Sequence, residues 1–316
     1  MNGSTNGVDH SPESGVLASL ASDAAKQVKS NANAQPSSGE SRRLPTAVHP
    51  PVIVPWSAPS NESTPNAFIS FLKDSKSKYG QQATALWGMT TADVRARTAM
   101  TAADFQRAIA IRPGYDLYVC SPAPELEALY PNLWSHLQVA IPKFQPTLRS
   151  VFKTLRWDLD QLLELQPSVT FSTSHYYIGS SKFWNSYCDF LQETITDITE
   201  RGTKSANRFL HQSAATGPAA TATHWSLFTD RLLPVFLRLK SNGLKVARIP
   251  IPAAEQKLNT HLKKLREMKD VAHHTKSQWL ASCWLHYRNT YLLNVAGRDW
   301  CQRNLPLMTP SDIRFY

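Results

Sequence analysis

Three acidic motifs hold the residues best suited to chemistry in this sequence. Asp116 lies in GYDLYVCSP beside a short apolar run, where a charge costs stability unless it is paired, hydrogen-bonded or bound to a cation. Asp158 and Asp160 form an Asp-x-Asp pair, and Asp230 precedes Arg231 in TDRLLP. A carboxylate at a strand end can hold Mg²⁺ or Mn²⁺ against a diphosphate, because hard cations prefer oxygen ligands. A buried metal or acid-base site is therefore one interpretation of these motifs.

Each acidic motif also has a structural interpretation. Asp116 can cap the turn made by Pro113 and Gly114, since aspartate side chains hydrogen-bond to nearby backbone groups. Leucines at helical spacing surround the Asp-x-Asp pair, whereas a metal-binding pair normally follows a buried strand. Asp230 and Arg231 can form a local charge pair on a helix. The residues alone leave these alternatives open for Asp116 and Asp230, and they favour an ordinary helix for the Asp-x-Asp pair.

The composition is that of a globular protein. The chain has 316 residues, of which 42% are hydrophobic, enough for one large or two modest domains. Its four cysteines are widely spaced without a CxxC pair, which predicts free, mostly buried thiols and a reducing compartment. No apolar run of about 18 residues and no secretory signal pattern occurs, so we expect a cytoplasmic protein. The motifs GxGxxG, GxxxxGK[ST], GxSxG and HExxH are also absent from the sequence.

The net charge of +10 comes from the C-terminal part of the chain. Residues 231 to 316 contain fifteen Lys and Arg against five Asp and Glu, while the rest of the chain is balanced. A basic face of this kind suits anionic lipid headgroups, a nucleotide diphosphate or nucleic acid. The alternative is a solvated helical face without a partner.

The pattern of apolar residues divides the chain into three parts. Residues 1–47 are rich in Ser, Asn, Ala, Gly and Pro and contain no aromatic residue, which predicts a disordered tail. Strands and helices alternate over 48–252, which predicts a single layered α/β/α domain, and 253–316 reads as a basic helical extension. The strands expected are 52–54, 83–89, 116–120, 168–180 and 244–252, and the helices include 66–80, 102–112 and 181–199.

Local signals place several helix ends. Thr101 and Asp104 form a capping box at the start of one helix, and Gly114 follows its end. We expect one long helix over 225–243, kinked at Pro234 and capped by Gly243. Between the helices expected over 181–199 and 225–243, residues 201–224 are polar and contain Gly and Pro, which predicts a mobile loop.

Several segments together resemble a known family. YGQQATALWGMTTADVRARTAMTAADFQRAI, PGYDLYVCSPAPELEALYPNLW, TSHYYIGSSKFWNSYCDFL and HWSLFTDRLLPVFL occur in the same order as related motifs of a bacterial glycosyltransferase-like group. This group is associated with surface-polysaccharide synthesis and has the A-type fold of nucleotide-diphospho-sugar transferases. The resemblance covers about residues 50–252 and is looser toward the N-terminal end.

The resemblance implies roles for residues at the matching positions. Arg97 and Thr98 stand at a Lys-Thr position of the family, and His175 stands where the family usually has Asn. The Ser-Trp-Lys-Phe core of the first motif is missing, and Asp230 is one methylene shorter than the usual Glu. The implied roles are catalysis by Asp116 and Asp230, metal binding (Mg²⁺ or Mn²⁺) by Asp116, donor binding by Arg97, Thr98, Tyr115, Tyr118 and Arg231, and acceptor or sugar contact by His175, Tyr177 and Trp184.

The expected function is transfer of a sugar from a nucleotide-sugar donor to a glycan acceptor during surface-polysaccharide synthesis. The basic C-terminal helices would hold such an enzyme against anionic lipid at the inner membrane face. The first motif lacks its Ser-Trp-Lys-Phe core, and Asp116 stands at its strand without the second acid of an Asp-x-Asp pair. These departures favour a second possibility, a non-catalytic glycosyltransferase-like interaction protein. A third, favoured only by the basic C-terminal part and the polar tail, is a nucleic-acid-binding or exported effector protein. No recognised nucleic-acid module supports it, so nucleic acid is the least expected partner.

Overall fold

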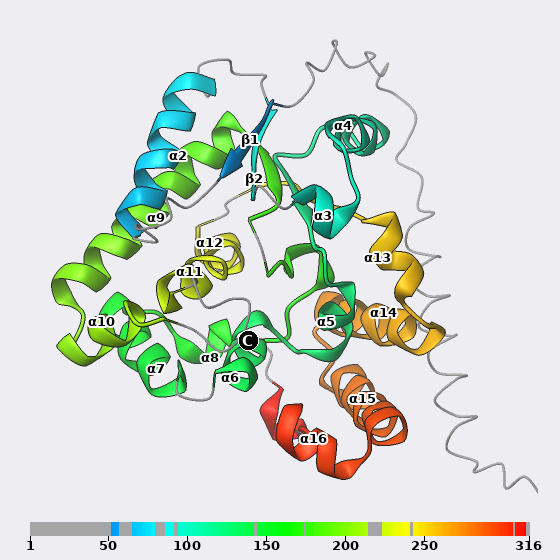
Figure 1. Cartoon of the computed structure of the whole chain (residues 1–316). Coiled ribbons are helices and arrows are strands. Elements are labelled where there is room, and N and C mark those ends of the chain that lie inside the picture. The colour runs from blue at the N-terminus through cyan, green and yellow to red at the C-terminus, as the bar shows by residue number, and fades with distance from the viewer. Residues whose placement is uncertain are drawn as a thin grey trace, which may run out of the picture.

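A computed structural model describes residues 52–56, 65–79, 86–91, 94–141, 144–173, 175–213, 223–240, 243–305 and 307–313. It is an α/β protein in which helices surround one small mixed sheet (Figure 1). The tail expected over 1–47 lies outside the described residues. No helix within these ranges is both long enough and apolar enough to cross a bilayer.

The sheet contains five strands in the described residues, in the order β1-β2-β4-β3-β5. They are β1 (Val52–Trp56), β2 (Leu86–Thr91), β3 (Leu117–Cys120), β4 (Tyr177–Ser180) and β5 (Val246–Ile249). The central strand β4 is antiparallel to both neighbours, and the outer pairs β1–β2 and β3–β5 are parallel. Four strands therefore end at the same edge, where β4 begins. We call this the carboxyl edge, and the opposite one the amino edge.

Apolar side chains leave the sheet on both faces. Leu117 and Val119 of β3 pack with α2 (Pro65–Tyr79), α9 (Ser181–Arg201) and α12 (Leu232–Leu239). Tyr118 and Cys120 point the other way, into a second cluster with Phe105 of α4 (Ala102–Ile111). All four β3 residues are buried, as expected of a strand covered on both sides. Figure 1 shows α2 and α9 on one side of the sheet and α3 and α4 on the other; we name the two faces the α9 face and the α4 face.

The remaining helices lie around this layered core. Trp284 in the C-terminal part donates a 3.1 Å hydrogen bond from Nε1 to the carbonyl of Ala128, and both residues belong to one buried apolar cluster. The segment expected as an extension thus packs against the α/β part of the chain. The remaining helices are α3 (Val94–Thr98), α5 (Pro124–Leu129), α6 (Leu133–Ala140), α7 (Phe144–Leu155), α8 (Leu159–Leu162), α10 (Lys204–Leu210), α11 (His224–Thr229), α13 (Pro252–Lys257), α14 (Thr260–Thr275), α15 (Gln278–Ala296), α16 (Arg298–Asn304), and the short 3-10 helices Ser168–Thr170 and Pro310–Asp312.

Several local predictions are confirmed. The Thr101 side chain accepts from the Asp104 amide while Asp104 bonds back to the Thr101 amide, so the capping box is present. Gly114, just past the end of α4, has a φ angle of 84°, the left-handed conformation in which glycine carries no steric penalty. Gly243 also has a positive φ angle, 74°, but it does not cap α12, whose C-cap is Lys240. All four cysteines are free, and Cys283 is the one that is not buried.

Three predicted elements are wrong in extent. The strand expected over 168–180 spans only Tyr177–Ser180, because Ser168 begins a 3-10 helix. The amide and the hydroxyl of Ser168 both donate to Asp270. The loop expected over 201–224 contains the helix α10. The single helix expected over 225–243 is broken at Asp230 and Arg231 rather than at Pro234. Pro234 lies in the first turn of α12, where its missing N–H is not needed for the helix.

Candidate functional site

A polar pair lies at the carboxyl edge on the α9 face. Nε2 of His175, two residues before β4, is 2.6 Å from Oδ1 of Asp230, at the end of α11. The His175 side chain is 7% exposed, and that of Asp230 is 21% exposed. The pair is therefore shielded on the imidazole side and reaches solvent through the carboxylate.

The break between α11 and α12 positions Asp230. The amide of Asp230 donates to the carbonyl of Ser226, and that of Arg231 donates to Phe228, which closes α11 with a tight turn. The next residue, Leu232, is fully buried and starts α12. Two neighbouring side chains then serve different elements, because Asp230 bonds to the segment before β4 while Arg231 reaches the carbonyl of Leu133.

Two buried tyrosines extend the pair into the core. Nδ1 of His175 is 2.6 Å from the hydroxyl of Tyr177, which is 3.3 Å from the hydroxyl of Tyr187 in α9. Burial raises the pKa of both phenols above the ordinary value, so both stay protonated near neutral pH. One arrangement that satisfies all four groups has Tyr187 donating to Tyr177, Tyr177 donating to Nδ1 of the Nε2–H tautomer of His175, and Nε2–H donating to Asp230.

This chain of hydrogen bonds orients the Asp230 carboxylate. Oδ1 accepts from His175, while Oδ2 makes no hydrogen bond to the part of the chain that the structure describes. Phe68 of α2 packs on the imidazole with a ring separation of 4.8 Å, which limits the positions open to His175. A fixed, partly exposed carboxylate with an available oxygen can accept a proton from a hydroxyl group.

Asp116 lies at the other edge of the sheet. Its Oδ2 accepts a 2.9 Å hydrogen bond from the amide of Lys245, and its Oδ1 is 3.5 Å from the hydroxyl of Ser180. Its own backbone also bonds to both residues. The side chain thus joins the starts of β3 and β5 to the end of β4. Asp116 therefore has a structural role, but as a link between strands and not as the cap of the turn made by Pro113 and Gly114.

The surroundings of Asp116 do not fit a divalent metal. Both of its carboxylate oxygens already accept hydrogen bonds from the protein. Within the described ranges, no group of three or more His, Cys, Asp or Glu side chains is arranged to hold a metal ion. We therefore assign neither Mg²⁺ nor Mn²⁺ to Asp116. Asp158, the first acid of the Asp-x-Asp pair, accepts from the amide of Asp160 at the start of α8, as expected of a helix cap.

The four proposed donor-binding residues near α3 and β3 fall into two groups. Arg97 is exposed, with its guanidinium 5.8 Å from the centre of the Tyr176 ring. The other three make local contacts: Thr98 donates to the carbonyl of Val94, Tyr118 donates to that of Arg112, and the amide of Tyr115 donates to the hydroxyl of Tyr118. Thr98 and Tyr118 also line a cavity of about 810 Å³ beside α4.

Arg231 and Trp184 have packing roles. Arg231 is 4% exposed and donates to the carbonyls of Leu133 and Leu227, with His136 at 3.4 Å. Burial lowers the pKa of Arg231 to about 10, and burial beside that cation lowers the pKa of His136 to about 4. Trp184 is fully buried, stacks on Trp87 at 4.1 Å and donates to its carbonyl. For Arg231 and Trp184, these contacts give no route to a bound sugar nucleotide.

The basic C-terminal part is less exposed than its charge indicates. Among the cations of this part that the structure describes, three are buried, namely Arg231, Lys269 and Arg288. Four more pair with carboxylates, namely Arg238 and Lys276 with Glu164, and Arg248 and Arg266 with Glu255. These contacts reduce the charge available for a lipid or nucleic-acid surface.

Some residues of interest carry no clear signal in the sequence. Tyr187 lies in an apolar helical pattern that predicts core, and only the fold brings its hydroxyl to Tyr177. Arg248 is the exception, because a cation inside the short strand VARI needs a buried partner. That partner is Glu127, which is fully buried in α5.

Comparison of the chain with protein-family models, curated proteins and solved structures found no match to any of them.

Proposed function

We propose that this protein transfers a sugar from a nucleotide-sugar donor to a hydroxyl group of a glycan acceptor, with Asp230 as the general base. The observation that carries the proposal is the 2.6 Å contact between His175 and Asp230. These residues are 55 positions apart, and both stand in segments that resemble glycosyltransferase motifs. Their meeting at the carboxyl edge supports a site there, since ligands of open α/β sheets collect outside the carboxyl ends of strands.

The chemistry asked of Asp230 is a single displacement. Oδ2 of Asp230 takes the proton of the acceptor hydroxyl group while the oxygen of that hydroxyl group forms a bond to the anomeric carbon of the donor sugar. The bond from that carbon to the diphosphate breaks, and the nucleoside diphosphate leaves with the electron pair. Such a displacement inverts the anomeric configuration. His175 acts as a positioning residue that holds the carboxylate, and Tyr177 holds His175.

The negative charge on the leaving diphosphate needs a cationic partner. Arg97 is the proposed donor-binding residue that remains for this role, because it is exposed near the end of α3; its guanidinium lies over Tyr176, whose ring packs on the α4 face. Arg231 is enclosed by carbonyl groups, so we do not assign it to the diphosphate. The donor sugar, the acceptor and a link to surface polysaccharides remain expectations from the family resemblance.

The test is release of nucleoside diphosphate from a panel of nucleotide sugars in the presence of glycan acceptors. With a general base removed, Asp230→Asn should lower turnover by about 10²–10⁴-fold. Asp189→Asn is the matched control, because Asp189 is 73% exposed on α9, and it should leave turnover unchanged. Equal turnover by wild type and Asp230→Asn would remove Asp230 from the reaction.

The packing of Asp116, Arg231 and Trp184 favours a second candidate, a non-catalytic glycosyltransferase-like interaction protein. Under this alternative, no donor of the panel is turned over. Wild type and Asp230→Asn would then restore function equally well in cells that lack the protein.

A further inference from the structure

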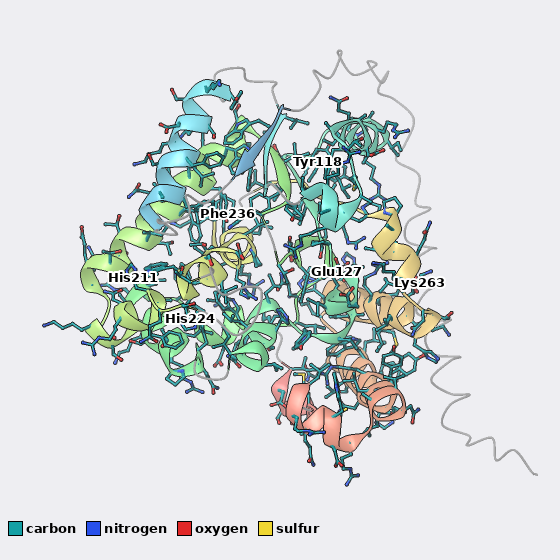
Figure 2. The ribbon with its side chains drawn as sticks, viewed as in Figure 1. Tyr118, Glu127, His211, His224, Phe236 and Lys263 are labelled. Carbon is teal, nitrogen blue, oxygen red and sulfur yellow. The ribbon has the colours of Figure 1, made fainter. Side chains whose placement is uncertain are left out.

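A second site candidate lies on the opposite face of the sheet. The cavity of about 810 Å³ is bounded by the end of α3, by α4, by the end of β5 and by α13. Tyr118, which is labelled in Figure 2 beside α3 and α4, belongs to the apolar cluster of the α4 face. His175 and Asp230 do not line this cavity. Its volume falls within the range of small-molecule sites, about 300–1,000 Å³.

The floor of the cavity is apolar and rigid. Met100, Tyr118, Ala247 and Ile249 are each 6% exposed or less, so their packing fixes the shape of this surface. Ala108 and the prolines Pro250 and Pro252 complete it. A flat or elongated apolar group can bury its surface here, which favours binding at about 25 cal/mol per Å² removed from water.

The walls of the cavity carry more positive than negative charge. Four arginines line it, Arg107 and Arg112 from the α4 side and Arg248 and Arg266 from the opposite side, against two acids, Asp104 and Glu255. Arg107 pairs with Asp104, whereas the exposed guanidinium of Arg112 makes no hydrogen bond or ion pair with residues that the structure describes. Arg112 is thus a cation at the cavity that no described residue compensates.

The inner wall is a partly compensated ion network. Arg248 contacts Glu127 at 3.1 Å and Glu255 at 2.6 Å, while Arg266 makes two 2.8 Å hydrogen bonds to Glu255. Glu127 also contacts both arginines, since its Oε1 accepts from Arg248 and its Oε2 lies 3.5 Å from Arg266, while burial raises the pKa of this carboxyl to about 7. Two carboxylates therefore face the two arginines of this wall, and the cation of the cavity without a described partner is Arg112.

We propose that this cavity binds an organic phosphate, with the apolar part of the ligand on Tyr118 and Ile249 and the phosphate among the arginines. Planar guanidinium groups bind phosphate oxygens in pairs, and Arg112, whose charge no described residue compensates, offers such a group at the cavity. A nucleotide and an alkyl phosphate share this chemistry. The site does not depend on sugar transfer, because it contains neither His175 nor Asp230.

Calorimetric titration of the full chain distinguishes the sources. The three probes are uridine diphosphate, n-hexyl phosphate and inorganic phosphate. At least one organic phosphate should bind about tenfold or more tightly than inorganic phosphate, because it also buries apolar surface. The tighter of the two organic probes identifies the source, a nucleotide or an alkyl phosphate.

Two variants locate the binding, each with a matched control. Arg112→Gln should weaken binding about tenfold by removing a charged hydrogen-bond donor, while Arg149→Gln, an exposed arginine of α7, should not. Ala253→Trp fills the cavity from an exposed position of α13 and should abolish binding, while Ala110→Trp, an exposed position of α4 outside the lining, should not.

Two results would overturn the proposal. Either no organic phosphate binds at about 5 mM, a concentration that detects even weak small-molecule sites, or Ala253→Trp leaves binding of the tightest probe unchanged. Asp230→Asn should bind the probes as wild type does. A failure here leaves the sugar-transfer proposal intact, and a failure of sugar transfer leaves this site intact.

Discussion

Asp230 and Asp116 are the two carboxylates that the sequence singles out, and they lie at opposite edges of one sheet. Asp230 accepts from a side chain, His175, and keeps one oxygen without a partner among the described residues. Asp116 accepts from a backbone amide and a hydroxyl, so both of its oxygens are used to join strands. The first arrangement leaves a carboxylate able to take a proton, whereas the second fixes backbone.

The difference follows from strand direction. Asp116 precedes β3 and therefore lies at the amino edge, while His175 precedes the antiparallel strand β4 and lies at the carboxyl edge. An acid next to an apolar run looks the same in sequence at either end of a strand. What the acid can do depends on which edge it occupies and on what the neighbouring strands bring to it.

The largest effect is expected from Gly179→Ala, because Gly179 lies in β4, the strand that joins the two edges. A Cβ there would lie 2.2 Å from the ring of Phe183, which is fully buried and cannot move aside. Overpacking of this kind should lower the free energy of unfolding by about 3 kcal/mol.

Urea unfolding measures this change, with Gly114→Ala as the control. Gly114 has no atom within 4 Å of an added Cβ and only its φ of 84° opposes alanine, so the loss there should be about 1 kcal/mol. Equal losses for the two variants would mean that β4 does not constrain both edges together.

A smaller effect, specific to the side of Asp230, is expected from acid. His136 lies behind Arg231, and its pKa of about 4 in the folded protein is below the ordinary 6.5. As the pH falls below 6.5, the unfolded chain takes up a proton at this residue while the folded protein does not, so stability is lost. The loss amounts to about 2 kcal/mol between pH 7 and pH 5.

His136→Gln should remove that part of the acid dependence. The difference in unfolding free energy between wild type and the variant, measured by urea unfolding at both pH values, isolates it from other histidines such as His273, whose pKa burial also lowers. The same difference at pH 7 and pH 5 would show that His136 titrates normally in the folded protein.

The elements with strong local signals could be predicted from the sequence. The capping box of Thr101 and Asp104 and the left-handed Gly114 depend on a few neighbouring residues, and they were found where expected. The break at Asp230 could not be predicted, because Pro234 is the stronger local signal and the burial of Leu232 against the core decides the outcome.

The candidate site could be predicted in part. Motif resemblance marked His175, Tyr177 and Asp230 separately, and the structure brings these three into one chain of hydrogen bonds. It does not bring Asp116 to them, because strand order and direction cannot be inferred from periodicity. Trp184 followed the general rule for aromatic residues at helical spacing and lies in the core.

The smallest of the expected effects concerns Tyr177. Tyr177→Phe removes the donor to Nδ1 of His175, so the imidazole can lose the tautomer that donates to Asp230. Turnover should fall about tenfold, a typical loss when a positioning hydrogen bond to a catalytic pair is removed. A role in positioning also predicts a changed pH profile of kcat, which purely structural damage would not produce.

The measurement that tests the account most directly is nucleoside-diphosphate release per folded molecule by Asp116→Ala, run beside Asp230→Asn. Asp116→Ala loses hydrogen bonds to Lys245 and Ser180, so its free energy of unfolding should be about 1–2 kcal/mol lower than that of wild type. Its folded molecules should still turn over within about twofold of wild type, whereas Asp230→Asn should lose at least about 10²-fold. A folded Asp116→Ala without activity, beside a fully active Asp230→Asn, would contradict the assignment of the chemistry to the carboxyl edge.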